Sequence, residues 1–245
     1  MKDSHCNSLP NTCLTCEKKK NSLFDGLSAD ELSLLESHRT TVNYKKGEAI
    51  YKEGIRPLGL LCLNAGKVKL VRTTKNNTQQ IMRLKRPVDF IDIRSVVSMT
   101  RYNHSAVALE ESSVCFIDTQ DFLRVLKGNS KLALKIIQTL TNELDEADSR
   151  FVNMTQKYMR ARLAETILYI KDFFGTLIDN ETINCTLTSS DLAGLSNMNI
   201  ANVIRTLSSF RQENLIDVVK KRIVLLNPQA VENISSEKDI AAHTL

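Results

Sequence analysis

The amino-acid sequence predicts an α+β fold made of an antiparallel β-roll, one long helix and a small helical domain that closes with a β-hairpin. Three observations support this prediction. Short β-rich runs that alternate apolar and polar residues fill residues 41–118. An unbroken apolar heptad follows within residues 130–158, and two close helical segments with a basic hairpin occupy residues 187–227. Alternation at period two indicates half-buried strands, whereas a heptad indicates a helix that pairs along one stripe.

The composition is that of an ordinary globular protein with a basic balance. Of the 245 residues, 42% are hydrophobic and 25% are charged, so the chain can build a core. The formal net charge of 33 − 28 = +5 suits an anionic partner. No run reaches the roughly 18 apolar residues that a membrane helix needs. Because the first residues also lack the apolar centre of a signal peptide, we expect a cytoplasmic protein.

The first 21 residues are polar, lack a period and carry half of the six cysteines. Cys13 and Cys16 form a Cys-x-x-Cys pair, and Cys6 precedes them. Disulfides are rare in cytosolic proteins. The spacing therefore favours a metal, a cluster or a redox role for this arm. The alternative is that scattered thiols form a chance pair without a function.

A helical pattern runs from Ser22 to His38, where Ser28 is a suitable N-cap and Glu31 stands at the position that completes a capping box. Leu32 and Leu35 are expected to face inward. The region after this helix predicts a β-sandwich or a β-roll, because many short strands are separated by turn residues. The runs expected as strands are 49–53, 58–64, 67–73, 79–85, 106–110 and 113–118.

The heptad predicts one long helix, Ser130–Tyr158, that pairs with a copy of itself. Its apolar residues alternate between spacings of four and three without a proline. The alternative is an amphipathic helix packed on its own domain, but such helices usually carry a wider stripe that drifts at 3.6 residues per turn. The candidate dimer-interface residues are Ile137, Leu140, Leu144, Ala147, Phe151 and Met154.

After a helix that ends at Gly175, the sequence predicts a helix-turn-helix followed by two short strands. Thr188 caps the first helix with Asp191 at its third position, and the second helix runs from about Asn199 to Gln212. A short helix, a tight turn and an exposed second helix are what major-groove reading requires. The alternative is a plain helical hairpin with a solvated basic turn.

The outward face of this second helix and the basic turn are the candidate DNA contacts. Arg205 can donate two hydrogen bonds to guanine O6 and N7. The basic run 220–222 lies where phosphates would be met, and phosphate contacts position the protein. The candidate DNA-binding residues are Thr188, Asn199, Ile200, Ala201, Asn202, Arg205, Lys220, Lys221 and Arg222.

The β-roll, the long helix and the winged helix-turn-helix together resemble the CRP/FNR family of bacterial transcription regulators over about residues 22–227. The most specific segment is Leu187–Ile216, which follows the family's helix-turn-helix without a gap. The family's recognition-helix arginine falls on Arg205, but its usual companions are replaced by apolar residues such as Ile200. We therefore expect a half-site that differs from the usual one, with Ile200 able to contact a thymine methyl group.

The resemblance also bears on the signal. Cyclic-nucleotide binders of the family carry Gly-Glu and, further on, Arg-Ser or Arg-Thr. Here Asp92-Ile93 and His104-Ser105 stand at those positions, and Arg101 is three residues out of register. A buried phosphate would lack its bidentate arginine. We therefore expect that cyclic AMP does not bind.

Residues 88–91 and 109–115 resemble the oxygen-sensing FNR branch, whose members bind a [4Fe–4S] cluster. Cys115 falls on the β-roll ligand, and Cys13 and Cys16 fall on two of the three N-terminal ligands. Ser22 stands at the third, so Cys6 would replace it. The resemblance thus implies a metal site at Cys6, Cys13, Cys16 and Cys115, since four thiolates suffice. Haem, another metal, or no cofactor are the alternatives.

Cys62 and Cys185 are interpreted as small buried strand thiols. The sequence contains no P-loop, no G-x-G-x-x-G, no G-x-S-x-G and no His-rich metal spacing, which argues against an enzyme. The resemblance implies a homodimeric, sequence-specific regulator that answers a redox, oxygen or small-molecule signal through its β-roll. Its partners would be a palindromic operator in double-stranded DNA and, for an activator, RNA polymerase. The alternative is a ligand-binding module that acts on a protein partner without binding DNA.

These patterns divide the chain into five segments. They are a cysteine-bearing arm (1–21), a β-roll sensor domain (22–128), a dimerisation helix (129–158), a winged helix-turn-helix domain (159–228) and a polar tail (229–245).

Overall fold

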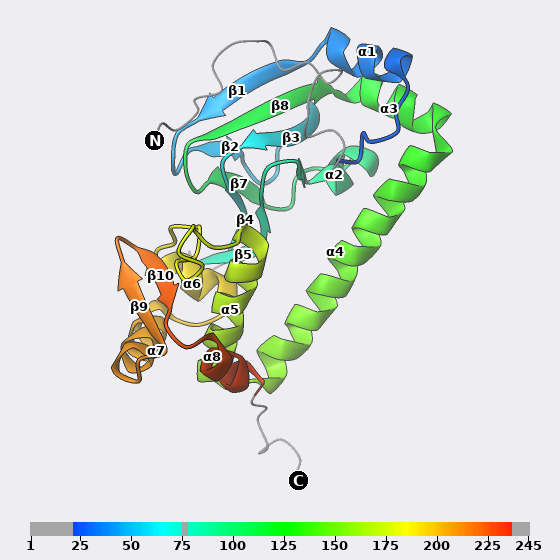
Figure 1. Ribbon diagram of the computed structural model, residues 1–245. Coiled ribbons are helices and arrows are strands. Elements are labelled where there is room, and N and C mark those ends of the chain that lie inside the picture. Colours follow the sequence, from blue (N-terminus) through cyan, green and yellow to red (C-terminus); the bar gives the residue numbers. More distant parts are fainter. Residues whose placement is uncertain (1–21, 75–77, 237–245) are drawn as a thin grey trace, which may run out of the picture.

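The structure, a computed structural model, describes residues 22–74 and 78–236, so the predicted arm lies outside the described residues. An N-terminal domain of strands and a C-terminal domain of helices are joined by the long helix α4 (Ser130–Gln156), as Figure 1 shows. This arrangement confirms the predicted α+β fold. Among the described residues, no helix is long and apolar enough to cross a membrane.

The N-terminal domain consists of two four-stranded antiparallel sheets that face each other, which confirms the predicted β-roll. Apolar side chains such as Leu63, Leu70 and Val114 fill the space between the sheets. In spatial order, the first sheet contains β1 (Thr40–Tyr44), β8 (Ser112–Asp118), β3 (Gly59–Ala65) and β6 (Phe90–Ile91). The second contains β2 (Ala49–Tyr51), β7 (Ser105–Ala108), β4 (Val68–Thr73) and β5 (Gln79–Lys85).

Each of the six predicted runs overlaps a strand, but four elements of this domain were not predicted. β1 is an edge strand whose side chains are mostly exposed, so it lacks the apolar alternation that marks a strand. β6 has two residues and exists because it pairs with β3. The helices α2 (Ile93–Val97) and α3 (Thr119–Gly128) are short, and α3 is capped by the Asp118 side chain.

The first helix, α1 (Ala29–Ser37), has the predicted capping box. The Ser28 hydroxyl accepts a hydrogen bond from the Glu31 amide (3.3 Å), and the Glu31 carboxylate accepts one from the Ser28 amide (2.8 Å). Leu32 and Leu35 are buried, as expected. The prediction that the helix begins at Ser22 is wrong, because Gly26 adopts a φ of 85° and the chain turns there.

Helix α4 confirms the predicted long helix and ends two residues before Tyr158. The Asn129 side chain caps it by accepting a hydrogen bond from the Leu132 amide at 2.9 Å. Leu132 and Ile136 are buried in a core that they share with α1, α3 and the outer face of the first sheet. The N-terminal half of α4 is thus anchored to the β-roll.

The C-terminal domain contains the predicted helix-turn-helix and β-hairpin. Its elements are α5 (Met159–Phe174), α6 (Ser189–Ser196), α7 (Ile200–Gln212), β9 (Ile216–Val219), β10 (Arg222–Leu225) and α8 (Pro228–Ser235). The prediction of a polar tail from residue 229 is wrong over 229–235, which belong to α8. Pro228 starts this helix, Asn227 caps it, and Val231 is fully buried in the domain core.

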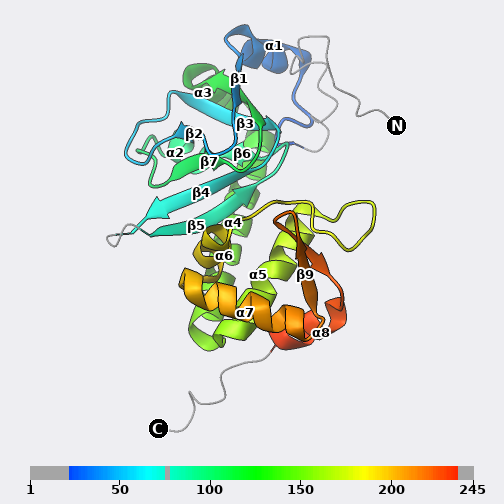
Figure 2. The ribbon, with the colours of Figure 1, turned by 90° about the vertical axis from the view of Figure 1, so that its left-hand side faces the viewer.

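The two domains share one hydrophobic core, because α6 packs against β5 (Figure 2). Val71, Ile81 and Leu84 of the β-roll lie in the same cluster as the helices of the C-terminal domain. The approach is close at Gly194 of α6, where an added Cβ would lie 2.6 Å from the Gln79 carbonyl oxygen. In this structure the helix-turn-helix is therefore docked on the β-roll.

Candidate DNA-binding interface and sensor site

Helix α6 is held by a reciprocal cap, as the sequence predicts. The Thr188 hydroxyl accepts a hydrogen bond from the Asp191 amide (3.1 Å), and the Asp191 carboxylate accepts one from the Thr188 amide (2.9 Å). These bonds satisfy backbone donors at the helix start. Leu192, Ala193 and Leu195 are buried, so the inner face is the predicted one. Thr188 itself is exposed at the start of the helix.

A tight turn at Asn197 joins α6 to α7. Its φ of 53° and ψ of 48° lie in the left-handed region, which asparagine tolerates better than most residues. The Asn199 side chain then caps α7 by accepting a hydrogen bond from the Asn202 amide at 2.7 Å. Val203 and Phe210 are fully buried, which fixes the inner side of α7 on its domain. The opposite side of α7 faces outward.

The outward side of α7 carries the predicted base-contacting residues. Ile200, Ala201 and Arg205 are exposed, and Asn202 is half-buried. Arg205 Nη2 donates a hydrogen bond to Asn202 Oδ1 (2.7 Å), which holds the guanidinium along the helix. The sequence analysis did not include Ile204, although its spacing of four from Ile200 places both on one face. Its side chain is 53% exposed and enlarges the apolar part of this surface.

Strand β9 of the β9–β10 hairpin contacts α7, and the basic run lies at the tip of this hairpin (Figure 1). Lys220 and Lys221 form its two-residue turn, are exposed, and have φ angles of 49° and 64°. Positive φ at both central residues is typical of a type I′ turn, which usually contains Asn-Gly. Arg222, the first residue of β10, is half-buried. Two lysines thus adopt a strained backbone at the tip of the hairpin.

Two arginines at the start of α5 fix both ends of α7, and the sequence analysis missed them. Arg160 forms a bidentate ion pair with Glu213 and lies 4.8 Å from the centre of the Phe210 ring. Arg162 Nη1 donates a hydrogen bond to the Asn197 carbonyl at 3.2 Å. Their spacing of two residues, just after the long helix, carries no pattern from which this role could be predicted.

The predicted dimer-interface residues form a stripe on α4 that is only partly used within the chain. Ile137, Leu144 and Phe151 are 58%, 59% and 69% exposed. Ala147 is also exposed, whereas Leu140 packs against the core around α1 and α3. Met154 lines a cavity of about 350 Å³ between α4, α5 and α6. The stripe thus leaves large apolar side chains in water.

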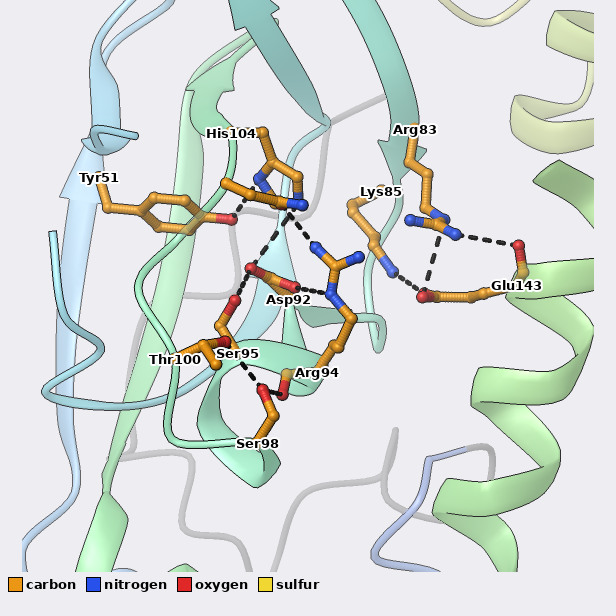
Figure 3. Close-up of polar contacts among 11 residues, drawn as sticks. Tyr51, Arg83, Lys85, Asp92, Arg94, Ser95, Ser98, Thr100, His104 and Glu143 are labelled. Carbon is orange, nitrogen blue, oxygen red and sulfur yellow. Dashed lines mark hydrogen bonds and ion pairs between the residues drawn. The ribbon is translucent and has the colours of Figure 1, made fainter. Parts of the chain in front are cut away.

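Asp92 and His104, at the family's nucleotide-binding positions, lie in a buried polar network that the exposed Arg94 borders, as Figure 3 shows. Asp92 accepts a hydrogen bond from the Ser95 hydroxyl (2.6 Å), lies 3.7 Å from His104 Nε2, and faces Arg94 at 3.8 Å. The other ring nitrogen of His104 is hydrogen-bonded to the Tyr51 hydroxyl (3.2 Å). Burial lowers the pKa of His104 below 6.5, and Asp92 only partly opposes this shift. The site thus holds a carboxylate beside an imidazole.

A second polar cluster joins the β-roll to α4 (Figure 3). Lys85 Nζ donates a hydrogen bond to the Glu143 carboxylate (2.8 Å), and Arg83 Nη2 donates one to the Glu143 carbonyl (2.9 Å). Burial alone would raise the pKa of Glu143, but Lys85 and Arg83 outweigh it and lower that pKa. Strand β5 is therefore tied to the middle of the long helix.

Of the four predicted metal ligands, only Cys115 lies within the described residues. It is half-buried on β8, and its sulfur accepts a hydrogen bond from Arg39 Nη1 at 3.2 Å. The Thr41 hydroxyl lies 3.7 Å from the same sulfur. Within the described residues, no group of three or more His, Cys, Asp or Glu side chains could hold a metal ion. The other predicted ligands, Cys6, Cys13 and Cys16, fall outside them.

The two remaining cysteines differ from each other. Cys185 is 5% exposed, and burial raises the pKa of its thiol to about 12, so the prediction of a buried thiol is confirmed. The prediction that it lies on a strand is wrong, because the segment between α5 and α6 makes only isolated β-bridges. Cys62 is only half-buried, because it lies at the rim of the core under α3 and α4. The prediction of a fully buried thiol is therefore wrong for Cys62.

A β-roll joined by a long helix to a winged helix-turn-helix defines a class of two-domain DNA-binding transcription regulators. Residues 41–129 match the cyclic nucleotide-binding domain, and residues 161–234 match the Crp-like helix-turn-helix domain. The chain belongs to the CRP/FNR family, whose members are transcription regulators and not enzymes.

Curated relatives are similar over most of their length. Electron transport regulator A of Shewanella oneidensis is 25% identical over 218 residues, which cover 88% of this chain and 86% of the relative. The cyclic AMP receptor protein of Thermus thermophilus is 24% identical over 199 residues, which cover 81% of this chain and 89% of the relative. Among solved structures, FixK2 of Bradyrhizobium japonicum superposes with a TM-score of 0.73 at 19% identity, covering 81% of this chain and 98% of FixK2. This likeness supports the fold.

Proposed function

We propose that this regulator acts as a homodimer in which two copies of α7 bind the half-sites of a palindromic operator. The observation that carries the proposal is the exposed apolar stripe of α4, centred on Leu144. In the same chain, one side of the recognition helix α7 faces outward. Exposed apolar side chains at heptad spacing are best buried against a second copy of the same helix. A two-fold dimer presents its recognition helices to sites about one helical turn apart, which explains palindromic operators.

Within each half-site, Arg205 donates hydrogen bonds to a guanine. Ile200 and Ile204 contact thymine methyl groups. Lys220, Lys221 and the start of α6 at Thr188 contact phosphates. Asn199, Ala201, Asn202 and Arg222 complete the interface. The support is that these residues, on α7, at the start of α6 and at the hairpin turn, are exposed, apart from the half-buried Asn202 and Arg222.

The test is a binding measurement with an operator selected from random duplexes. Arg205→Ala should weaken operator binding by about 1–3 kcal/mol and relax one base position. Lys221→Ala should weaken all sequences alike and reduce the salt slope by about 1. Arg211→Ala is the matched control, because Arg211 is an exposed α7 arginine paired with Asp217. Equal losses on operator and random DNA for Arg205→Ala would contradict the assignment.

The alternative function, regulation of a protein partner without DNA, predicts no salt-dependent binding to any duplex. A measurement at two salt concentrations separates the two, because counterion release makes DNA affinity fall steeply with salt. If the protein activates transcription, RNA polymerase is a further partner.

The signal enters through the β-roll and is, we propose, redox, oxygen or a small molecule other than cyclic AMP. Asp92 supports the exclusion of cyclic AMP, because a buried carboxylate beside the phosphate position would repel the ligand. Burial lowers the pKa of His104, which disfavours the protonated imidazole that would be needed in place of an arginine. Cyclic AMP should therefore leave the melting temperature unchanged.

For the redox signal, the proposal is a [4Fe–4S] cluster on Cys6, Cys13, Cys16 and Cys115, with haem or another metal as the alternative. Cys115 fits a cluster ligand, since the residue is only half-buried and the Arg39 guanidinium beside its sulfur compensates negative charge. Such a cluster supplies an oxygen-labile group with a redox change. Anaerobic reconstitution should bind about four iron and four sulfide per chain, and Cys115→Ser should lose most of both. Cys185→Ser, which alters a buried thiol elsewhere, should retain them.

A further inference from the structure

Two cysteines that are far apart in the sequence meet in the first sheet. Cys62 of β3 and Cys115 of β8 are direct partners in the antiparallel register. Partners of this kind point to the same side of a sheet, with Cβ atoms about 4.5–5.5 Å apart. The two cysteines therefore lie side by side on neighbouring strands in the interior of the sheet. Their sulfurs have other partners: the Cys62 sulfur lies 3.9 Å from the Val88 carbonyl oxygen, and the Cys115 sulfur contacts Arg39 and Thr41.

The Cα separation of this pair lies within the range of disulfides. The Leu63 amide and carbonyl bond toward residues 88 and 89, so those of the alternate residue Cys62 point toward β8. The pair is thus of the hydrogen-bonded type, in which Cα atoms lie about 5.5 Å apart. Disulfides span Cα separations of about 4.4–6.8 Å but Cβ separations of only about 3.5–4.5 Å. A bond therefore requires both cysteine side chains to rotate and the two strands to approach locally, and the resulting strain makes the bond easier to reduce.

The surroundings of these two cysteines differ from those of a thiol enclosed in the core. On the same side of the sheet, Leu60 and Ile117 are fully buried beneath the helices. Cys62 and Cys115 lie at the rim of this core and are half-buried. The nearly buried Arg39 side chain, 10% exposed, donates its hydrogen bond to the Cys115 sulfur. Cys185, in contrast, is closed off from solvent.

We propose that Cys62 and Cys115 are an oxidisable dithiol, which a hydroperoxide converts into an intramolecular disulfide. The Cys115 sulfur attacks the peroxide, the O–O bond breaks, an alcohol or water leaves, and Cys115 becomes a sulfenic acid. The Cys62 sulfur then attacks the Cys115 sulfur, the S–O bond breaks and water leaves. Two thiols are oxidised by one peroxide, which is reduced.

This site is separate from the cluster proposal, although both use the Cys115 sulfur. A cluster-bound Cys115 cannot form the disulfide, so oxidation requires protein without iron. The dithiol does not depend on the arm, because both sulfurs lie within the β-roll. The two proposals can therefore fail independently.

The experiment treats reduced, iron-free, full-length protein with hydrogen peroxide and maps tryptic peptides by mass. The expected product joins peptide 53–67 to peptide 102–124, each of which contains one cysteine, with the loss of two hydrogen atoms. Cys115→Ser should abolish this product. Cys62→Ser should instead leave a Cys115 sulfenic acid that a 1,3-dione traps. The matched control, Cys185→Ser, should give the wild-type product.

Two outcomes would overturn the proposal. One is a Cys115 joined to Cys6, Cys13 or Cys16 with Cys62 still reduced. The other is that both thiols remain open to alkylation after peroxide treatment. If a serine variant fails to fold, the wild-type chain still tests the proposal. Samples are alkylated at intervals during peroxide treatment, and the proposal requires that alkylation of Cys62 and alkylation of Cys115 are lost together.

Discussion

The Lys69 ammonium of β4 lies 2.5 Å from the Asp191 carboxylate of α6, so one carboxylate links the sensor sheet to the first helix of the helix-turn-helix. The Lys69 and Asp191 side chains are 15% and 8% exposed, so the pair is largely buried between the two domains. Asp191 also closes the capping box with Thr188. Any movement of the DNA-binding domain away from the β-roll must therefore break this ion pair.

Lys69→Met should weaken the docking of the two domains. It leaves the Asp191 charge buried without its cation, which we expect to cost about 3–5 kcal/mol. The measurement is urea unfolding followed by a probe in each domain. The wild type should show one transition, and the variant should show an earlier loss of the C-terminal domain.

Lys67→Met is the matched control, because the Lys67–Glu110 pair lies within the β-roll and does not reach α6. A similar loss in both variants would mean that Lys69 stabilises only its own strand. Adding Asp191→Asn to Lys69→Met should recover part of the stability, since no charge then remains unpaired.

The docking should also weaken in acid. Burial alone would raise the pKa of Asp191, but hydrogen bonds from Lys69 and Thr188 outweigh it and hold that pKa below 3.8. A carboxyl group whose pKa is lower in the folded state than in the unfolded state stabilises the fold at any pH above its unfolded-state pKa. This stabilisation is lost as the pH falls through the folded-state pKa. The stability difference between wild type and Asp191→Asn should therefore shrink as the pH falls below 3.8. A difference that stayed constant with pH would contradict the role of this charge.

Gly194→Ala should separate α6 from β5. The added Cβ would lie 2.6 Å from the Gln79 carbonyl oxygen, which belongs to the backbone and cannot rotate away. We expect a loss of about 1–3 kcal/mol, measured by thermal or urea unfolding. Gly128→Ala is the control, because a Cβ there meets nothing within 4 Å. Equal effects of the two substitutions on the free energy of unfolding would show that they arise from helix propensity and not from the close approach of α6 to β5.

Leu144→Glu should convert the dimer into monomers. Leu144 is 59% exposed in one chain, and a dimer would bring two glutamates together in an apolar interface. Sedimentation at micromolar concentration measures the result. Asn142→Glu adds the same charge on another side of α4 and should remain dimeric. A wild type that sediments as a monomer, with and without oxygen, would contradict the proposed interface.

Replacing the hairpin turn Lys220-Lys221 with Asn-Gly should stabilise the domain and weaken DNA binding. Both lysines have a positive φ, which costs about 1–2 kcal/mol per ordinary residue, whereas Asn and Gly favour this turn. We expect a gain of about 1 kcal/mol in unfolding. The salt slope of DNA binding should fall by about 2, since two phosphate contacts are lost. Unchanged DNA binding would show that the hairpin does not contact DNA.

Local signals in the sequence were sufficient for most elements. The capping residues Ser28 and Thr188 act on backbone groups within three residues, so their pattern predicts the helix start directly. The heptad predicts α4 to within two residues, and the alternating runs predict six strands. The exposed face of α7 follows from its buried residues, because the helical period places Arg205 opposite Phe210 and Val203.

Contacts between distant segments were decided only by the tertiary structure. The partnership of Cys62 with Cys115 depends on the register of β3 and β8, and nothing near either cysteine encodes it. The same holds for Lys69 and Asp191, which come from different domains, and for α8, whose single buried residue, Val231, gains its environment from the domain core. Sequence patterns report which face of an element is apolar; which other element covers that face depends on packing over the whole chain.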